Sequence, residues 1–460
     1  MGRRSRTPTS SNEIICYGTG IYRVYAGFAH RRGTSARHPS VPKKLFLIRC
    51  STPLYSIPSE AHCSLYGTYE CPSDGENARR PAVPAHVATA RIHQVGDSGD
   101  QMVKHAVAAA VIGVGAVSGA WAQSSVTLYG SMDAGVAYVN NVGGHAKWAM
   151  IQGNTQPDRW GLKGKEDLGD GLSAIFQLEN GFYTNNGQFA TANTIWNRAA
   201  FVGLGSERYG TLTLGRQTPL SFDYLDPLST AYLAMSWYAF HPGNIDGLAA
   251  TGNVPYNNSV KYRSPTFAGF SAAATMALGN TTNFSTGKSV GVALNYANGP
   301  FKASAVYSNE HDRSILISTT GITSFQGQNT ANGYTASKVE NIGAGASYQF
   351  GDFLVHGLYT RTKMQSNGFS DTFQSYDAGV NYRSSAFNTI AGGAATTTLA
   401  GRRWTQVELG DIYALSKRTQ LYANVLYEHG SGGAKAAFFT AGVSSTANQV
   451  IVLTGIHHSF

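Results

Sequence analysis

Short stretches in which apolar and polar residues alternate recur throughout residues 123–460. In VTLYGSMDAGVAYV, which begins at Val126, mostly apolar side chains share one face with Leu128, whereas Tyr129, Ser131 and Asp133 share the other. A period of two predicts β-strands. Roughly 16 strands of about 9–11 residues can be placed, and no segment has the roughly 20 apolar residues of a transmembrane helix.

The connections between these predicted strands differ in length. Tight turns are predicted at 168–171, 206–210, 298–300, 350–352 and 416–419, and long polar connections at 310–338 and 430–447. The longest connection runs from Gln217 to Tyr256. Short turns at one end and long loops at the other are typical of an all-β, up-and-down antiparallel barrel that spans a membrane.

A soluble β-sandwich would show the same alternation, with one buried face and one wet face. Two features favour the membrane barrel. Tyr and Phe recur near the predicted strand ends, as the aromatic girdles of such barrels require. The chain also ends in a strand-like segment, VIVLTGIHHSF, that places Val452, Ile456 and the terminal Phe460 on one face.

An export signal lies inside the chain, in MVKHAVAAAVIGVGAVSGAWAQ from Met102. Lys104 precedes an apolar run, and Ala120-Trp121-Ala122 forms an A-x-A cleavage site. This order predicts a secretory signal peptide over 102–122, with a mature chain that starts at Gln123. A buried helix is the alternative, which the glycines of the run disfavour.

Composition divides at the same place. Residues 1–101 hold 13 basic and 7 acidic residues and all four cysteines, whereas residues 123–460 hold 21 and 19. The basic excess therefore lies mostly upstream, and a nucleic-acid partner is not indicated. The cysteines could form a zinc site or two disulfides. We interpret 1–101 as a segment that is either outside the mature protein or disordered. Met102 is then the true start, or alternatively 1–101 is a cytoplasmic leader.

The mature region resembles the general porins of Gram-negative bacteria, most closely the trimeric porins of β-proteobacteria. The resemblance rests on SSVTLYGSMDAGVAYV, DRWGLKGKEDLGDGLSAIFQLENGF, NRAAFVGLGSERYGTLTLGRQ, YALSKRTQLYA and the terminal Phe460. It implies a 16-stranded barrel over 123–460 in the outer membrane, a homotrimer, passive passage of small hydrophilic solutes, and recognition of Phe460 by the barrel-assembly machinery. Outer-membrane lipid and lipopolysaccharide would surround it.

The resemblance also implies where the pore narrows. The third loop, about 217–256, would fold into the lumen, and DPLSTAYLAMSWY within it predicts a short helix capped by Asp226. Basic residues would line the facing wall, since the lipid face excludes charge. The basic candidates are Arg159, Arg198, Arg216, Arg263, Lys163 and Lys261, and the loop acids are Asp223, Asp226 and Asp246. Asp133 and Glu179 are further lumenal candidates.

Few acids face many cations in this arrangement, which predicts a preference for anions. No catalytic, metal or cofactor site is expected, because no serine-hydrolase motif or ligand cluster occurs. Three alternatives remain open from the sequence: an outer-membrane enzyme, a structural or adhesion barrel, and a channel specific for sugars or phosphate. Aromatic residues of the loop could line a sugar path, although packing explains them equally well.

Overall fold

The computed structural model describes residues 125–251, 254 and 256–460. The predicted upstream segment, 1–101, and the predicted signal peptide, 102–122, lie outside the described residues. Most of the described chain is β-strand, and its α-helices are short. Within these ranges, no helix combines the length and the apolarity needed to cross a membrane.

Nineteen strands follow one another along the part of the chain that the structure describes. They are β1 (Ser125–Val142), β2 (His145–Gln152), β3 (Arg159–Gly169), β4 (Leu172–Gly181), β5 (Ala199–Ser206), β6 (Gly210–Gln217), β7 (Tyr256–Arg263), β8 (Phe270–Ala277), β9 (Ser289–Asn298), β10 (Phe301–Ile315), β11 (Ser324–Phe325), β12 (Gln328–Asn329), β13 (Tyr334–Phe350), β14 (Phe353–Ser366), β15 (Phe369–Arg383), β16 (Asn388–Leu399), β17 (Arg402–Ala414), β18 (Thr419–Ser431) and β19 (Asn448–Ser459).

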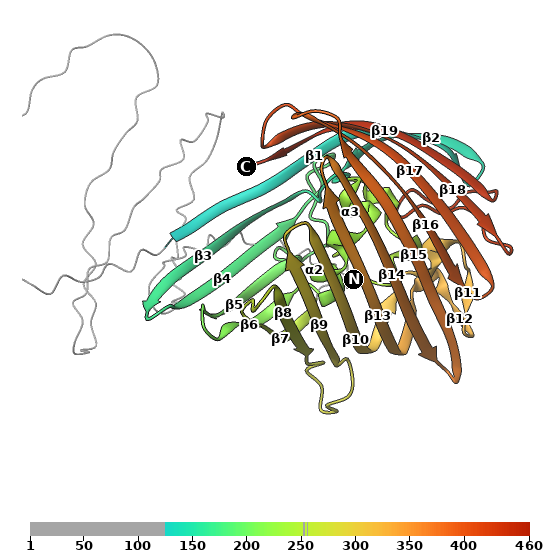
Figure 1. Ribbon diagram of the computed structural model, residues 1–460. Helices are drawn as coiled ribbons and strands as arrows, with labels where there is room; N and C mark the ends of the chain where they lie inside the picture. The colour runs from blue at the N-terminus through green and yellow to red at the C-terminus, as the bar shows by residue number, and fades with distance from the viewer. Residues whose placement is uncertain (1–124, 252–253, 255) are drawn as a thin grey trace, which may run out of the picture. The chain divides into compact units, whose positions relative to one another are not determined.

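Seventeen of these strands form one closed antiparallel barrel (Figure 1). β1 pairs with β19 and so joins the two ends of the sheet, with Val139 opposite Ile451. The other edge of β1 is shared, because 134–142 pairs with β2 and 125–131 pairs with β3. β2 and β3 therefore occupy one position, interrupted at 153–158, and the barrel has the sixteen strand positions predicted from the sequence.

Side chains alternate between the two faces of the wall, as the period of two requires. On β1, Val126 and Leu128 are 65% and 59% exposed, whereas Ser131 and Asp133 are buried. The other strands repeat the pattern, with large apolar side chains exposed on the outer face and polar ones buried inside. An apolar outer band around a polar interior is the arrangement that lets a barrel stand in lipid.

The tight turns lie where the sequence predicts them, for example between β13 and β14. The long connections are shorter than predicted, because polar strand residues continue the ladder beyond the membrane: β10 and β13 leave only 316–333 between them. Two connections at that same end are two-residue hairpins, Asn367-Gly368 and Ala400-Gly401. All four residues have positive φ, as in the type I′ turns that match strand twist.

The inner segment, residues 218–251, runs between β6 and β7 and contains α2 (Leu220–Tyr224) and α3 (Thr230–Leu233). α2 packs against β9 and β10, which follow β7 and β8 around the ring. α3 packs against β15 and β16, on the opposite side of the ring from β6 and β7 (Figure 1). The predicted cap is displaced by three residues. Ser229, not Asp226, caps α3, because its hydroxyl accepts the Tyr232 N–H.

Buried hydrogen bonds attach the inner segment to the wall. The Thr230 N–H donates to Asp377 of β15 at 2.9 Å, and the Thr360 hydroxyl of β14 donates to Asp246 at 2.7 Å. A third attachment lies at the wall break. There the main-chain N–H of Trp237 donates to the carbonyl of Asn154 at 2.8 Å. The inner segment therefore contacts both sides of the barrel interior.

Candidate functional site

A cavity of about 430 Å³ lies between the inner segment and the wall formed by β3, β4 and β7. Both groups of charged residues described below line it. The cationic members are Arg159, Arg198, Lys261 and Arg263, and the acidic members are Glu179, Asp223 and Asp226. Seven of the eleven residues that the sequence nominated therefore meet around one space.

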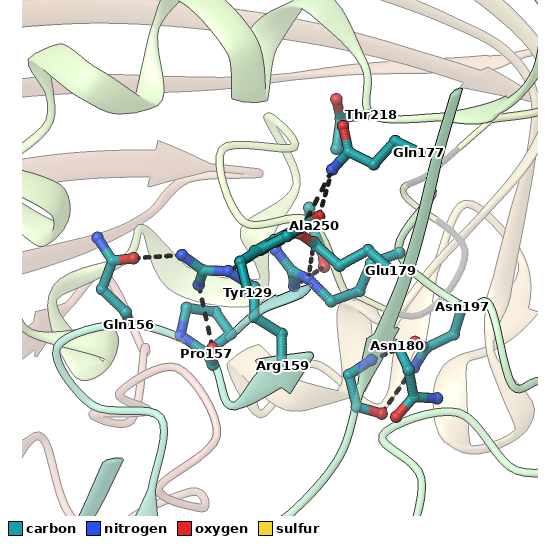
Figure 2. A network of polar contacts seen from close by, with 12 residues as sticks. Tyr129, Gln156, Pro157, Arg159, Gln177, Glu179, Asn180, Asn197, Thr218 and Ala250 are labelled. Carbon is teal, nitrogen blue, oxygen red and sulfur yellow. Dashed lines mark hydrogen bonds and ion pairs between the residues drawn. The ribbon is translucent and has the colours of Figure 1, made fainter. Parts of the chain in front are cut away.

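The first group is centred on Glu179 of β4 (Figure 2). Its carboxylate accepts the Arg198 Nε–H at 2.7 Å and the Tyr129 hydroxyl at 2.8 Å, and the Nε of Arg159 lies 3.9 Å away. Gln177 donates to the Tyr129 oxygen at 2.7 Å. Each of these strand residues points inward because it occupies an alternate position of its strand.

The two guanidinium groups are held in place by further acceptors. Arg159 donates to the Gln156 side chain at 2.6 Å and to the Pro157 carbonyl at 3.1 Å (Figure 2). Arg198 donates to the carbonyl of Ala250 at 3.4 Å, which also ties it to the inner segment. The guanidinium groups of Arg159 and Arg198 therefore share a single carboxylate, that of Glu179.

The second group is centred on Asp223 of α2. Its carboxylate accepts Lys261 Nζ at 2.7 Å, Arg263 Nη2 at 2.6 Å and the Thr218 hydroxyl at 2.6 Å. Burial alone would raise the pKa of Asp223, but the charges of Lys261 and Arg263 outweigh it and hold the pKa below its usual value. Asp223 is therefore ionised and shared between two cations as well.

The charges around the cavity do not balance. Four cations line it, and Glu179 and Asp223 are each shared between two of them. The third acid, Asp226, is fully buried and bonded to Ser229, and burial raises its pKa well above the usual range. This shift favours the neutral carboxyl, so the cavity wall has an excess of positive charge.

The remaining nominated acids have other surroundings. Asp246 accepts from His241 at 2.6 Å and from Thr360, deep between the inner segment and β14. Asp133 is buried in the wall, where it accepts the Tyr422 hydroxyl at 2.7 Å and the Thr155 N–H at 2.8 Å. Both acids therefore hold the interior together and do not line this cavity.

The remaining basic candidates also lie apart. Lys163 points inward on β3, with its ammonium 5.2 Å from the centre of the Tyr129 ring. Arg216 shares the alternate positions of Leu212 and Leu214, which are exposed on the outer face. Its guanidinium donates to the Asn197 carbonyl at 2.8 Å and to Asn257. The structure thus separates Arg216 from the four cations of the cavity.

Phe460 closes the barrel at its last residue. Its main-chain N–H and carbonyl exchange hydrogen bonds of 3.1 and 3.0 Å with Gly130 of β1. The ring lies over Gly130, so a Cβ added at Gly130 would collide with Phe460 Cζ. The absence of a side chain at Gly130 therefore makes the space for the terminal aromatic ring.

Sequence reasoning missed some residues of the site. Tyr129 and Gln177 share alternate positions with Ser131 and Glu179, so the alternation along these strands is the signal that could have identified them. His241 has no such signal in the sequence. The Nε2 of its ring lies 3.5 Å from Asp377, more than a hundred residues away, and no local pattern indicates that contact.

Comparisons with known proteins agree with this architecture. Residues 106–433 match the family of Gram-negative porins. An outer membrane porin protein of Bordetella pertussis is 30% identical over 418 residues, with 78% of this chain and all of the relative covered. Outer membrane porin protein 32 of Delftia acidovorans is also 30% identical, over 388 residues, with the same coverage.

A solved structure shows the same barrel. The anion-selective porin from Comamonas acidovorans superposes with a TM-score of 0.62 at 28% identity, covering 74% of this chain and all of that one. The chain belongs to the Gram-negative porin family and is a channel protein of the outer membrane.

Proposed function

We propose that the chain passes small hydrophilic solutes by diffusion through a water-filled pore, that the inner segment sets its narrowest part, and that the pore prefers anions. The excess of cations around the 430 Å³ cavity is the observation that carries this proposal. Charged rings select ions of the opposite sign. The relative from Comamonas acidovorans is described as anion-selective, which supports the same preference here.

Transport of this kind needs no catalytic step. The residues of the constriction would be Arg159, Arg198, Lys261 and Arg263, with Asp223 on the facing segment. Asp223 would tie the inner segment to the wall and partly offset the cations. Selectivity then depends on the ratio of charges at the cavity and not on the charge of the whole chain.

Planar-bilayer recordings test the proposal, with protein purified from outer membranes and a gradient of KCl across the bilayer. Stepwise conductance with a reversal potential close to that of chloride is expected. A reversal potential close to that of potassium would overturn the anion preference and keep the channel. Well-folded protein without conductance would overturn the channel itself.

We further propose that three copies assemble in the membrane, in contact with lipid and lipopolysaccharide, and that Phe460 is the signal read by the barrel-assembly machinery. Family membership supports both statements, and the exchange of hydrogen bonds between Phe460 and Gly130 shows that the last residue completes the wall. Chemical crosslinking of intact outer membranes should yield a band of three subunits. Dimers or monomers alone would contradict the trimer.

A further inference from the structure

A second cavity, of about 600 Å³, adjoins the first. Pro157, Arg198 and Trp237 line both, so these three residues form the boundary between the two spaces. The second cavity is also bordered by β2 and by the last residues of β10. A solute that passes from one cavity to the other must therefore pass Trp237 and Arg198.

One side of this boundary is aromatic. The ring of Trp237 packs against Phe240 and Phe439, with ring centroids 5.2 and 5.5 Å away, and those two rings lie 6.0 Å from each other. Phe240 and Phe439 are buried, whereas Trp237 is only partly buried and borders both cavities. Packing accounts for the two phenylalanines, but it leaves part of the tryptophan facing the path of the solute.

The other sides are cationic. Arg198, Arg313 and Lys147 line the second cavity, and Asp158 is the acidic residue among the described lining residues. Arg198 is paired with Glu179 and Arg313 with Glu310, at 2.7 and 3.2 Å, but neither of these acids lines the cavity. The carboxylate of Asp158 already accepts main-chain N–H groups of Asp133 and Thr184, at 2.6 and 2.9 Å. Lys147 is exposed, and no ion pair with it occurs in the described part of the chain.

An aromatic surface beside several cations suits a particular class of solute. A planar ring stacks favourably on tryptophan, and a carboxylate on that ring is attracted by Arg and Lys. Inorganic anions would use only the cations. Neutral sugars would leave the cations without a role. The volume also lies within the range of small-molecule sites.

We propose that the second cavity binds small aromatic carboxylates, which stack on Trp237 and pass with their carboxylate leading to Arg198 and Arg159. This inference rests on the proposed channel function and names a substrate class for it. The aromatic ring of the solute stays stacked on Trp237 while its carboxylate leaves Lys147 and Arg313 and moves to the cations of the first cavity.

The test compares two carboxylates of similar size in the same bilayer recordings. Benzoate has a planar ring, and cyclohexanecarboxylate does not. Benzoate should interrupt the chloride current at a concentration about threefold to tenfold lower than cyclohexanecarboxylate does, the factor that an aromatic contact contributes. Equal potency of the two acids would overturn the proposal, and this comparison needs no variant.

Variants locate the effect. Trp237→Leu should abolish the preference for benzoate. Lys147→Gln should raise the concentrations of benzoate and cyclohexanecarboxylate needed to block the chloride current by about the same factor. The matched control is Trp148→Leu, since Trp148 is 74% exposed, neighbours Lys147 on β2 and lines neither cavity. A preference that survives Trp237→Leu, or is lost in Trp148→Leu, would overturn the assignment. If the unaltered protein shows no chloride conductance at all, the proposed channel function is overturned instead.

Discussion

Replacement of Glu179 by Gln changes the charge of the first cavity with little change of shape. The glutamine keeps one oxygen, which can accept the Arg198 Nε–H, and its amide N–H can donate to the Tyr129 oxygen in place of the second carboxylate oxygen. Arg159 and Arg198 lose the only carboxylate that they share among the described residues. The substitution should therefore raise the preference of the channel for anions.

The size of the change follows from Coulomb's law. For an ion that passes at about 7 Å through water, one unit charge is worth about 0.6 kcal/mol, and 0.1 M salt reduces this to about half. Removal of the negative charge stabilises chloride in the pore by this reduced energy and destabilises potassium by the same amount, so the difference between the two ions changes by about 0.6 kcal/mol. The ratio of chloride to potassium permeability should rise about threefold.

Reversal potentials under a KCl gradient measure this ratio directly. Asp352→Asn is the control, because it also removes one negative charge, but from an exposed ion pair with Arg383 at the turn between β13 and β14. That variant should leave the ratio unchanged. A ratio that stays the same or falls in Glu179→Gln would refute the view that this carboxylate offsets cations in the path of the ion. The effect should also shrink at higher salt.

Three further predictions concern stability and assembly. Asp377→Ala removes the buried acceptor of the Thr230 N–H and one of the two carboxylates beside His241, and should lower the free energy of unfolding by about 2–5 kcal/mol in denaturant titrations; a change below about 1 kcal/mol would contradict this attachment. Burial would lower the pKa of His241, but the nearby charges of Asp246 and Asp377 raise it to about 10. The stabilisation from His241 is therefore complete below about pH 6.5 and is lost as the pH rises towards 10, so the melting temperature should fall over that interval in the parent and not in His241→Gln. Gly130→Val places a side chain where the Phe460 ring lies, and should lower the amount of heat-resistant folded barrel in membranes, whereas Gly357→Val, whose added Cβ meets only the Asp377 carbonyl at an ordinary 3.7 Å, should affect that yield less.

The pattern of alternation predicted the wall well. It placed Leu128 outside and Ser131 inside, and it identified Arg159 as an inward residue. The resemblance to porins, not the alternation, predicted Arg263 in the lumen. The rule depends only on the geometry of a strand, which is local in sequence. The same rule would have placed Arg216 outside with Leu214, had it been applied to β6.

The interior beyond the wall was less predictable. The sequence indicated an apolar loop between β6 and β7, but not which residues it would contact. The contact of His241 with Asp377 joins residues that are far apart in the chain, and although Asp246 is only five residues from His241, all three polar side chains could equally have faced water. The extent of the strands was also hidden, because polar residues beyond the membrane follow no hydrophobic period.

The interruption between β2 and β3 has a consequence for how such a channel can change through evolution. At this break, the main-chain carbonyl of Asn154 accepts a hydrogen bond from the main-chain N–H of Trp237. Both groups belong to the main chain, so this attachment does not depend on the identity of either side chain. Side chains on the inner segment can therefore be exchanged, and the solutes admitted can change with them, while the segment stays fastened to the same point of the barrel.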